Sequence, residues 1–168
     1  AYGRLMILST LLSLSLAFAS PPDLHDVTTG PDLNRLNAQA DRVVRGEVLT
    51  TRTQLETDNA YTVATVRVLE TLRGHASPVI EVRMAGASLP EHELVVHGGA
   101  RLITGHEVLL FLNGDQLVNM GDGAFVIKDG AAWRGEAPWT WADPETVGQH
   151  RNDHYVSLDL EQLKRLIQ

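Results

Sequence analysis

The stretch that most constrains the fold is residues 104–115, which read T-G-H-E-V-L-L-F-L-N-G-D. Five consecutive apolar residues, 108–112, lie between turns that contain Gly105 and Gly114. A short apolar run bounded by turn residues is typical of a strand that is buried on both faces. We therefore expect residues 108–112 to form the centre of the core.

Period-two alternation before this stretch predicts three further strands, at residues 42–52, 60–72 and 79–84. Their connections are short and hydrophilic, which favours an antiparallel meander. Gly46 interrupts the first of these strands and indicates a bulge or a tight barrel bend. A short helix is expected before them, at residues 31–41.

The pattern after residue 115 predicts a closing hairpin and a terminal helix. Residues 116–120 and 124–128 flank Gly-Asp-Gly at 121–123, which is a hairpin signal. A final strand is expected at 131–134 and a loop at 135–156. Ser157 is expected to cap a C-terminal helix.

Short strands with one late helix predict an all-β fold with short flanking helices. The first choice is a five-stranded, partly open antiparallel barrel like the oligonucleotide/oligosaccharide-binding (OB) barrel. A β-sandwich is the alternative.

The N-terminal residues carry the features of an export signal. Arg4 precedes an apolar segment at 5–19, which ends in Ala-Phe-Ala. This order predicts a signal peptide at 1–19, cleaved after Ala19, or a retained membrane anchor at 5–19. Residues 20–30 are expected to be a linker, and residues 31–168 a single domain. The predicted location is periplasmic or extracellular, with membrane attachment only if the anchor is retained.

Composition excludes several classes of function. The net charge is −7 and no basic run is present, which excludes nucleic-acid binding by phosphate contacts. The chain has no cysteine, so disulfides, thiolate zinc sites and cysteine nucleophiles are excluded. The sequence also lacks the common hydrolase, metalloprotease, P-loop and dinucleotide motifs. We therefore expect a protein without enzymatic activity and without a bound cofactor.

Histidine spacing raises one alternative, a divalent-metal site. His150 and His154 are four residues apart, the spacing of two ligands on one helical turn. His92, His97 and His106 form a second group, with glutamates beside them. Solvated loop histidines are the simpler explanation of both groups. The metal hypothesis therefore requires these loops to converge.

Three tryptophans, Trp133, Trp139 and Trp141, lie within nine residues of one another. Clustered aromatic rings either bind a partner or fill a small core beneath a loop. We take them as candidate partner-binding residues.

Four segments carry a family resemblance: A-D-R-V-V-R-G-E-V at 40–48, V-R-V-L-E-T-L-R-G at 66–74, 97–112, and G-A-F-V-I-K-D-G at 123–130. Their succession resembles a group of exported bacterial proteins without a settled activity. It is similar to the netrin-type or metalloprotease-inhibitor-type module, an elaborated OB barrel. Inhibitors of that type bind the catalytic zinc through an N-terminal cysteine. This chain has no cysteine, so the resemblance implies the fold and not that mechanism.

These observations favour an exported, non-enzymatic binding module, such as an accessory subunit of an extracytoplasmic or membrane assembly. The expected contact surface is residues 85–103 together with 133–141. Two alternatives stay open. The first is a metal-binding protein or metal-dependent enzyme that uses the loop histidines. The second is a protease-inhibitor-like module that inserts a loop into a groove.

Overall fold

The computed structural model describes residues 33–57, 59–88, 93–94, 99–135 and 155–167. The signal or anchor segment expected at 1–19 and the linker expected at 20–30 lie outside these ranges. Within them, neither helix has the length and apolar character needed to cross a membrane.

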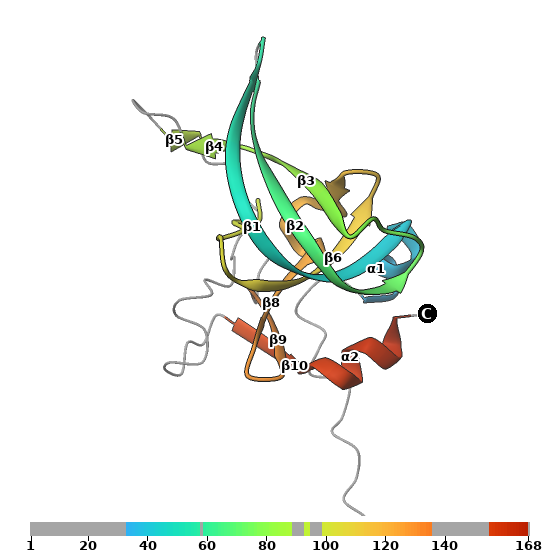
Figure 1. The fold of residues 1–168 in the computed structure, drawn as a ribbon. Helices are drawn as coiled ribbons and strands as arrows, with labels where there is room; N and C mark the ends of the chain where they lie inside the picture. Colours follow the sequence, from blue (N-terminus) through green and yellow to red (C-terminus); the bar gives the residue numbers. More distant parts are fainter. Residues whose placement is uncertain (1–32, 58, 89–92, 95–98, 136–154, 168) are drawn as a thin grey trace, which may run out of the picture.

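The described part of the chain is dominated by strands, with one short helix near each end (Figure 1). The elements in chain order are α1 (Leu33–Gln39), β1 (Arg42–Glu56), β2 (Asn59–Arg73), β3 (Val79–Ala85), β4 (Ala87–Ser88), β5 (Glu93–Leu94), β6 (Glu107–Asn113), β7 (Gln116–Leu117), the 3-10 helix η2 (Met120–Gly123), β8 (Ala124–Lys128), β9 (Ala131–Gly135), β10 (Tyr155–Asp159) and α2 (Leu160–Leu166).

Five strands close into a barrel in the order β1-β2-β3-β7-β6, and β6 returns to pair with β1. All of these pairings are antiparallel except β3–β7, which is parallel and consists of the single pair Arg83 and Gln116. We call the junction of β3 and β7 at this pair the seam. The expectation of an all-β barrel with short flanking helices is confirmed, and the parallel seam is a feature that the sequence did not indicate.

Strand β6 is buried on both faces because it belongs to two cores. Val108, Leu110 and Leu112 point into the barrel, where they pack with side chains of β1, β2 and β3. Leu109 and Phe111 point the other way, into a second cluster with residues of α1, α2, β8 and β9. All five are at most 1% exposed. The prediction that residues 108–112 form the centre of the core is confirmed.

The second cluster lies outside the barrel, between β6 and the two helices. Phe111 and Phe125 are its largest members, and their ring centroids are 5.9 Å apart in a tilted arrangement. Its buried residues are Leu36, Ala40, Val43, Leu109, Phe111, Val118, Phe125, Ala132, Leu163 and Ile167. The short helices are therefore stabilised by packing on the barrel wall rather than by their own length.

The closing hairpin predicted at 121–123 is wrong. Residues 120–123 form η2, and strands β7 and β8 do not pair with each other. Both pair with the same edge of β6 in succession: Leu112 lies opposite Leu117, and Leu110 opposite Ala124. Since the other edge of β6 is occupied by β1, the turn between β7 and β8 must run along β6 instead of folding back.

The C-terminal helix begins later than its predicted cap. Ser157 lies opposite Trp133 in the β9–β10 ladder, so its backbone is extended. The side chain of Asp159 caps α2 instead, because its Oδ1 accepts a hydrogen bond of 2.8 Å from the Gln162 N–H. At the ends of the loop expected at 135–156, Gly135 belongs to β9 and Tyr155 begins β10, while residues 136–154 lie outside the described residues.

The distal parts of β1 and β2 extend past the barrel as a two-stranded arm (Figure 1). The arm comprises residues 50–56 and 59–65, which pair without a register shift. A two-stranded hairpin is marginally stable alone. This one continues into β3, because β2 pairs with β3 from Tyr61 to Arg67.

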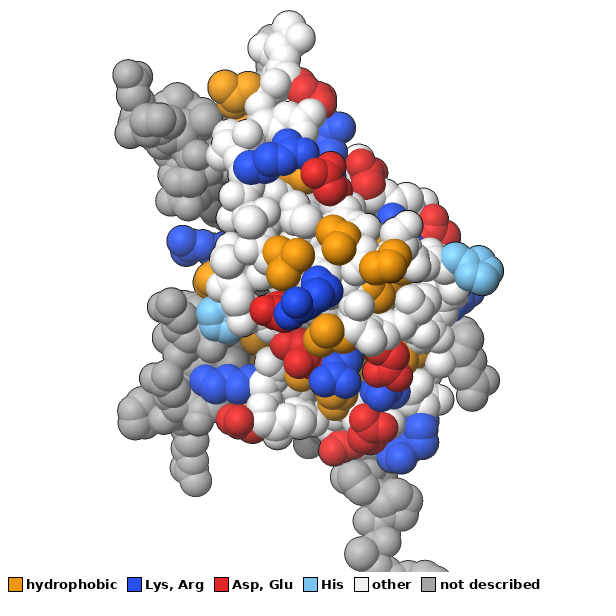
Figure 2. Space-filling model, in the orientation of Figure 1, with side chains coloured by type: hydrophobic (Ala, Val, Ile, Leu, Met, Phe, Trp, Pro, Cys, Tyr) orange, Lys and Arg blue, Asp and Glu red, His pale blue; other side chains and the backbone are white. Residues whose placement is uncertain are grey.

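Two ion pairs cross the middle strand and hold the arm against β3. Arg52 Nη2 is 2.9 Å from Glu81 Oε1, and Arg83 Nη2 is 2.6 Å from Glu56 Oε2. Val63 lies between Arg52 and Arg83 in the same row and is only 3% exposed. Figure 2 shows acidic and basic side chains intermingled on this part of the surface. The ion pairs therefore connect the tip of the arm to Arg83, which lies at the seam.

A substitution at Gly46 tests how closely β1 packs against β2. The β1–β2 register shifts between Arg45 and Gly46, as expected for a bulge. A Cβ atom at this position would lie 2.6 Å from Val66 Cγ1 and 2.7 Å from the Arg67 carbonyl oxygen. We expect Gly46→Ala to lower the free energy of unfolding by about 2–3 kcal/mol, measured by urea denaturation.

Gly130→Ala is the matched control. Gly130 has φ +76 with no atom within 4 Å of an added Cβ, so the substitution costs only backbone strain, about 1 kcal/mol. A Gly46→Ala variant as stable as the Gly130→Ala variant would contradict the close packing of β1 on β2.

Candidate functional site

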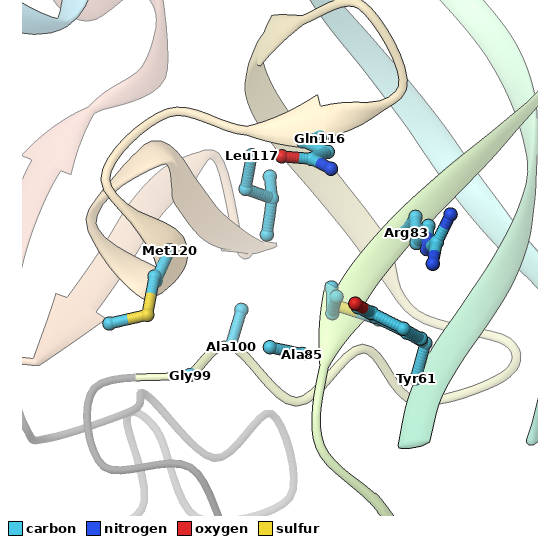
Figure 3. A pocket seen from close by; sticks show the side chains of 9 residues that line it. Tyr61, Arg83, Ala85, Gly99, Ala100, Gln116, Leu117 and Met120 are labelled. Atoms are coloured by element: carbon cyan, nitrogen blue, oxygen red, sulfur yellow. The ribbon is translucent and has the colours of Figure 1, made fainter. Parts of the chain in front are cut away.

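A small, partly open pocket of about 100 Å³ lies at the seam of the barrel (Figure 3). Five segments meet there: β2, β3, the chain that leads into β6, β7, and the start of η2. The residues that line the pocket are Tyr61, Arg83, Met84, Ala85, Gly99, Ala100, Gln116, Leu117 and Met120. We call it the seam pocket.

Arg83 holds both the seam and one wall of the pocket. Its backbone N–H donates to the Asp115 carbonyl oxygen at 2.7 Å, which fixes β3 beside β7. Its guanidinium carbon lies 3.7 Å from the centroid of the Tyr61 ring, a cation–π contact. The hydrogen bond to Glu56 raises the pKa of Arg83 above its usual value, and its Coulombic attraction adds to this. Arg83 is therefore a permanently charged side chain held in one position from two sides.

The floor of the pocket is apolar and its opposite rim is an exposed methionine. Met84 and Leu117 are 6% and 9% exposed. Met120 is 49% exposed, and Figure 3 shows it across the pocket from Arg83 and Tyr61. The pocket thus combines a charged and aromatic wall, an apolar floor and a flexible thioether at its edge.

The turn that carries Met120 is strained. Asn119 has φ 49 and Met120 has φ 58, two consecutive left-handed residues that are not glycine. Asparagine tolerates this conformation, but methionine in it costs of the order of 1–2 kcal/mol. Strain of this kind persists only where the surrounding structure imposes it, and it is concentrated at binding sites and active sites.

A tightly packed backbone imposes this conformation. The Val118 N–H donates to the Phe111 carbonyl oxygen at 3.0 Å, which fixes the turn on β6. Gly123 closes the turn, where an added Cβ would lie 2.7 Å from the Val118 oxygen and 2.9 Å from the Phe111 oxygen. Only glycine fits there, so the positions of Asn119 and Met120 follow from the contact with β6.

A partly buried acid and a buried base lie behind this turn. Burial raises the pKa of Asp122 above its usual value, and the charges of Arg134 and Arg35 oppose the rise. Arg134 is 3% exposed, and burial lowers its pKa against the attraction of Asp122. The Arg134 guanidinium also lies 5.8 Å from the centroid of Phe125. These two residues couple η2 to β9 and to the second core.

The size of the seam pocket limits what it can bind. Pockets for cofactors and drug-sized ligands are roughly 300–1,000 Å³. At about 100 Å³, the seam pocket accommodates a group the size of one amino-acid side chain.

A second depression of about 580 Å³ lies on the far side of β7. It is more open, and it is lined by Ala38, Gln39, Asn113, Gln116, Leu117, Val118 and Asn119. It shares Gln116 and Leu117 with the seam pocket but lacks a charged or aromatic side chain. The seam pocket is therefore the better candidate, although it is smaller.

The predicted metal ligands are not brought together in the described part of the chain. His92, His97, His150 and His154 lie outside it. His106 is half-buried, its Nδ1 has no hydrogen-bond partner, and the neighbouring Glu107 pairs with Arg45 at 2.6 Å. Among the described residues, no cluster of three or more potential ligands is present. The metal site stays a prediction.

Of the three tryptophans, only Trp133 lies in the described part. It is in β9, half-buried, and its Nε1–H donates to the Lys128 carbonyl oxygen at 3.4 Å. It does not line the seam pocket. Trp139 and Trp141 lie outside the described residues, so the role of the tryptophans in binding a partner stays a prediction.

The segment expected to form the contact surface, residues 85–103, contributes to the pocket through its described ends. Ala85, Gly99 and Ala100 line the pocket. The sequence did not indicate Tyr61, Arg83, Gln116 and Met120 as site residues, because only the β3–β7 pairing brings their segments together. One signal was present: Asn119 and Met120 immediately precede Gly-Asp-Gly and belong to a turn.

Comparison with known proteins adds no assignment: no protein-family model matches the sequence, and no curated protein matches it. The resemblance to netrin-type modules therefore stays an interpretation of the sequence motifs. The barrel itself rests on the observed strand pairings.

The pH dependence of stability tests whether Asp122 is buried behind the turn. The raised pKa means that the folded state binds the proton more tightly than the unfolded chain, whose aspartate has a pKa near 3.8. The contribution of Asp122 to stability is therefore largest below pH 3.8 and is lost as the pH rises through the folded-state pKa. The amide side chain of the Asp122→Asn variant cannot ionise, so we expect this variant to gain stability relative to the wild type across this window.

Urea denaturation of both proteins at a series of pH values measures this difference. Subtracting the two curves removes the contributions of the other carboxylates. A difference that does not change with pH would contradict the burial of Asp122 behind the turn.

Proposed function

We propose that this protein is an exported, non-enzymatic binding module whose seam pocket receives one side chain of a protein partner. The observation that carries the proposal is the arrangement around the pocket. Met120 is 49% exposed in a strained turn and lies opposite a fixed pair, Arg83 and Tyr61.

The residue types at the rim support a protein partner. The centres of protein–protein interfaces are enriched in tyrosine, methionine and arginine. The residues that contribute most to binding are commonly tyrosine, tryptophan and arginine beside a well-packed pocket. Tyr61, Arg83 and Met120 bring this combination together around one cavity.

The rigidity of Arg83 supports the same conclusion. Ordering a long side chain on binding costs about 0.5–1.5 kcal/mol. Glu56 and Tyr61 already hold Arg83 in the free protein, so this cost is largely absent at the seam. Met120 can adapt to its partner, because its side chain is unbranched and polarisable.

The pocket chemistry indicates the kind of anchor. Its apolar floor of Met84, Leu117 and Ala100 suits an apolar side chain, and its volume suits one residue. Polar groups beside such an anchor would meet the Gln116 amide and the Tyr61 hydroxyl. The export signal expected at residues 1–19 supports a partner outside the cytoplasm, in an extracytoplasmic or membrane assembly.

A charged side chain introduced at the rim of the seam pocket tests the proposal. We expect Met120→Lys to lower the recovery of a specific partner at least tenfold when the tagged full chain is expressed in its native organism. A tenfold loss corresponds to about 1.4 kcal/mol of binding free energy. Quantitative mass spectrometry of the co-purified proteins measures it, after a thermal melt has shown that the variant folds.

Leu69→Lys is the matched control, since Leu69 is 48% exposed but does not line the pocket. It should leave recovery of the partner unchanged. Equal recovery with both variants, or equal loss, would contradict a binding role for the seam pocket.

A further inference from the structure

The two described methionines line the same pocket but differ in exposure. Met84 forms part of the floor of the seam pocket and is 6% exposed, whereas Met120 forms the rim and is 49% exposed. The third methionine, Met6, lies outside the described residues. An oxidant must reach the sulfur atom itself, so exposure decides which thioether reacts. The seam pocket therefore carries one accessible thioether and one that the fold protects.

The backbone of the turn keeps Met120 at the surface. Its φ of 58 places it in the left-handed region, which a methionine adopts only under constraint. The Val118 N–H donates to the Phe111 carbonyl oxygen, and the close packing of Gly123 holds the rest of the turn on β6. A rotation that buried the thioether would break these contacts. The exposure of Met120 is therefore built into the fold.

Hydrogen-bond donors lie on the wall of the pocket that faces Met120 (Figure 3). Arg83 and Gln116 carry N–H groups, and Tyr61 carries a hydroxyl. A thioether is only a weak acceptor, whereas oxidation of its sulfur makes the side chain polar. Since the cavity measures only about 100 Å³, a polar oxygen at the rim lies close to these donors.

We propose that Met120 is a reversible oxidation site through which a peroxide closes the seam pocket. The inference rests on the proposed function, because it concerns the regulation of the same pocket. In the reaction the O–O bond of hydrogen peroxide breaks, an S–O bond forms, the sulfur loses two electrons, and water is the second product. A sulfoxide reductase that uses a dithiol reverses the step, since the dithiol becomes a disulfide and the oxygen leaves as water.

Oxidation opposes the binding of an apolar anchor in two ways. The new oxygen would lose its water when an apolar side chain enters beside it, and this loss is unfavourable without a replacement hydrogen bond. The oxygen also directs the flexible Met120 side chain toward the donors of Gln116 and Arg83, into the space that the anchor would occupy. The cavity accommodates one side chain, so the oxidised Met120 and the anchor exclude each other.

Site-resolved mass spectrometry tests the selectivity of the reaction. When the folded full chain is treated with dilute hydrogen peroxide, we expect Met120 to be oxidised faster than Met84 by about tenfold or more, because only its sulfur is accessible. In the urea-unfolded chain the two rates should be equal, which shows that the fold causes the difference. Equal rates in the folded protein would overturn the proposal.

Nuclear magnetic resonance of side-chain amides tests the closing of the pocket without a partner. Oxidation of Met120 should shift the side-chain amide signals of Gln116, which lines the pocket. The signals of Gln54 should not move, because Gln54 lies on the arm and donates to Glu56. The Met120→Leu variant has no thioether at the rim, so peroxide should leave its Gln116 signals unchanged. Unshifted Gln116 signals in the oxidised wild type would overturn the proposal.

Recovery of the partner tests the consequence for binding. The purified, tagged full chain is oxidised, desalted and then mixed with an extract of the native organism, so that the partner never meets the peroxide. Oxidation should lower the recovery of the partner that co-purifies with the untreated chain by about tenfold. Reductases for both sulfoxide epimers, supplied with dithiothreitol, should restore it. The dithiol leaves the fold intact, because the chain has no cysteine.

Two variants separate this inference from the proposed function. In Met120→Leu, the ratio of recovery after peroxide to recovery before it should stay near one, whatever the starting recovery. An equal fall in this variant would overturn the inference, because another residue would then be responsible. Loss of the partner in Met120→Lys, together with full recovery by the oxidised wild type, would overturn regulation by oxidation and leave the binding role intact. Unchanged recovery in both cases would overturn the inference and the proposed function together.

Discussion

The structure depends on the double burial of β6. Its five apolar residues alternate between the barrel interior and an outer cluster that anchors both helices and the β8–β10 extension. Neither cluster is complete without this strand. Burying a side chain of this size contributes about 1.5–3 kcal/mol, and β6 supplies such contributions to both sides of the barrel wall. One face of β6 thus belongs to the core of the barrel, and the other face belongs to the outer cluster.

The position of β6 also explains where the seam forms. One edge of β6 is occupied by β1, and the other is divided between β7 and β8. Strand β7 is consequently short, and β3 reaches it through one pair only. The incomplete closure leaves room for the seam pocket and brings Arg83 next to Gln116. The strained turn at Asn119 and Met120 has the same origin, since the chain must follow β6 closely between β7 and β8.

Much of the fold could be predicted, because its signals are local. The apolar run of β6, the alternation of β1 to β3 and the bulge at Gly46 are all visible in short windows of sequence. The features that were missed depend on competition between distant segments. Gly-Asp-Gly is typical of a hairpin turn, but the two strands that flank it pair with β6 and not with each other. Ser157 precedes the C-terminal helix as a cap would, but it pairs with β9 in an extended conformation.

The candidate site was less accessible to sequence reasoning for the same reason. Histidines and tryptophans are recognisable candidates in a sequence because their chemistry is distinctive, whereas Arg83 and Tyr61 are ordinary residues of alternating strands. Their role appears only when Glu56, at the tip of the arm, and Gln116, across the seam, are placed beside them. The arm itself was visible only as a long pair of strands.

Native-state hydrogen exchange tests the central claim, that one strand joins two cores, most directly. If β6 couples them, the slowly exchanging amides of the barrel strands β1 and β2 and of the outer strands β8 and β9 should share one opening free energy, equal to that of global unfolding. The amides of the arm should exchange at lower free energies. Two separate opening free energies, one for the barrel and one for the outer cluster, would contradict the account.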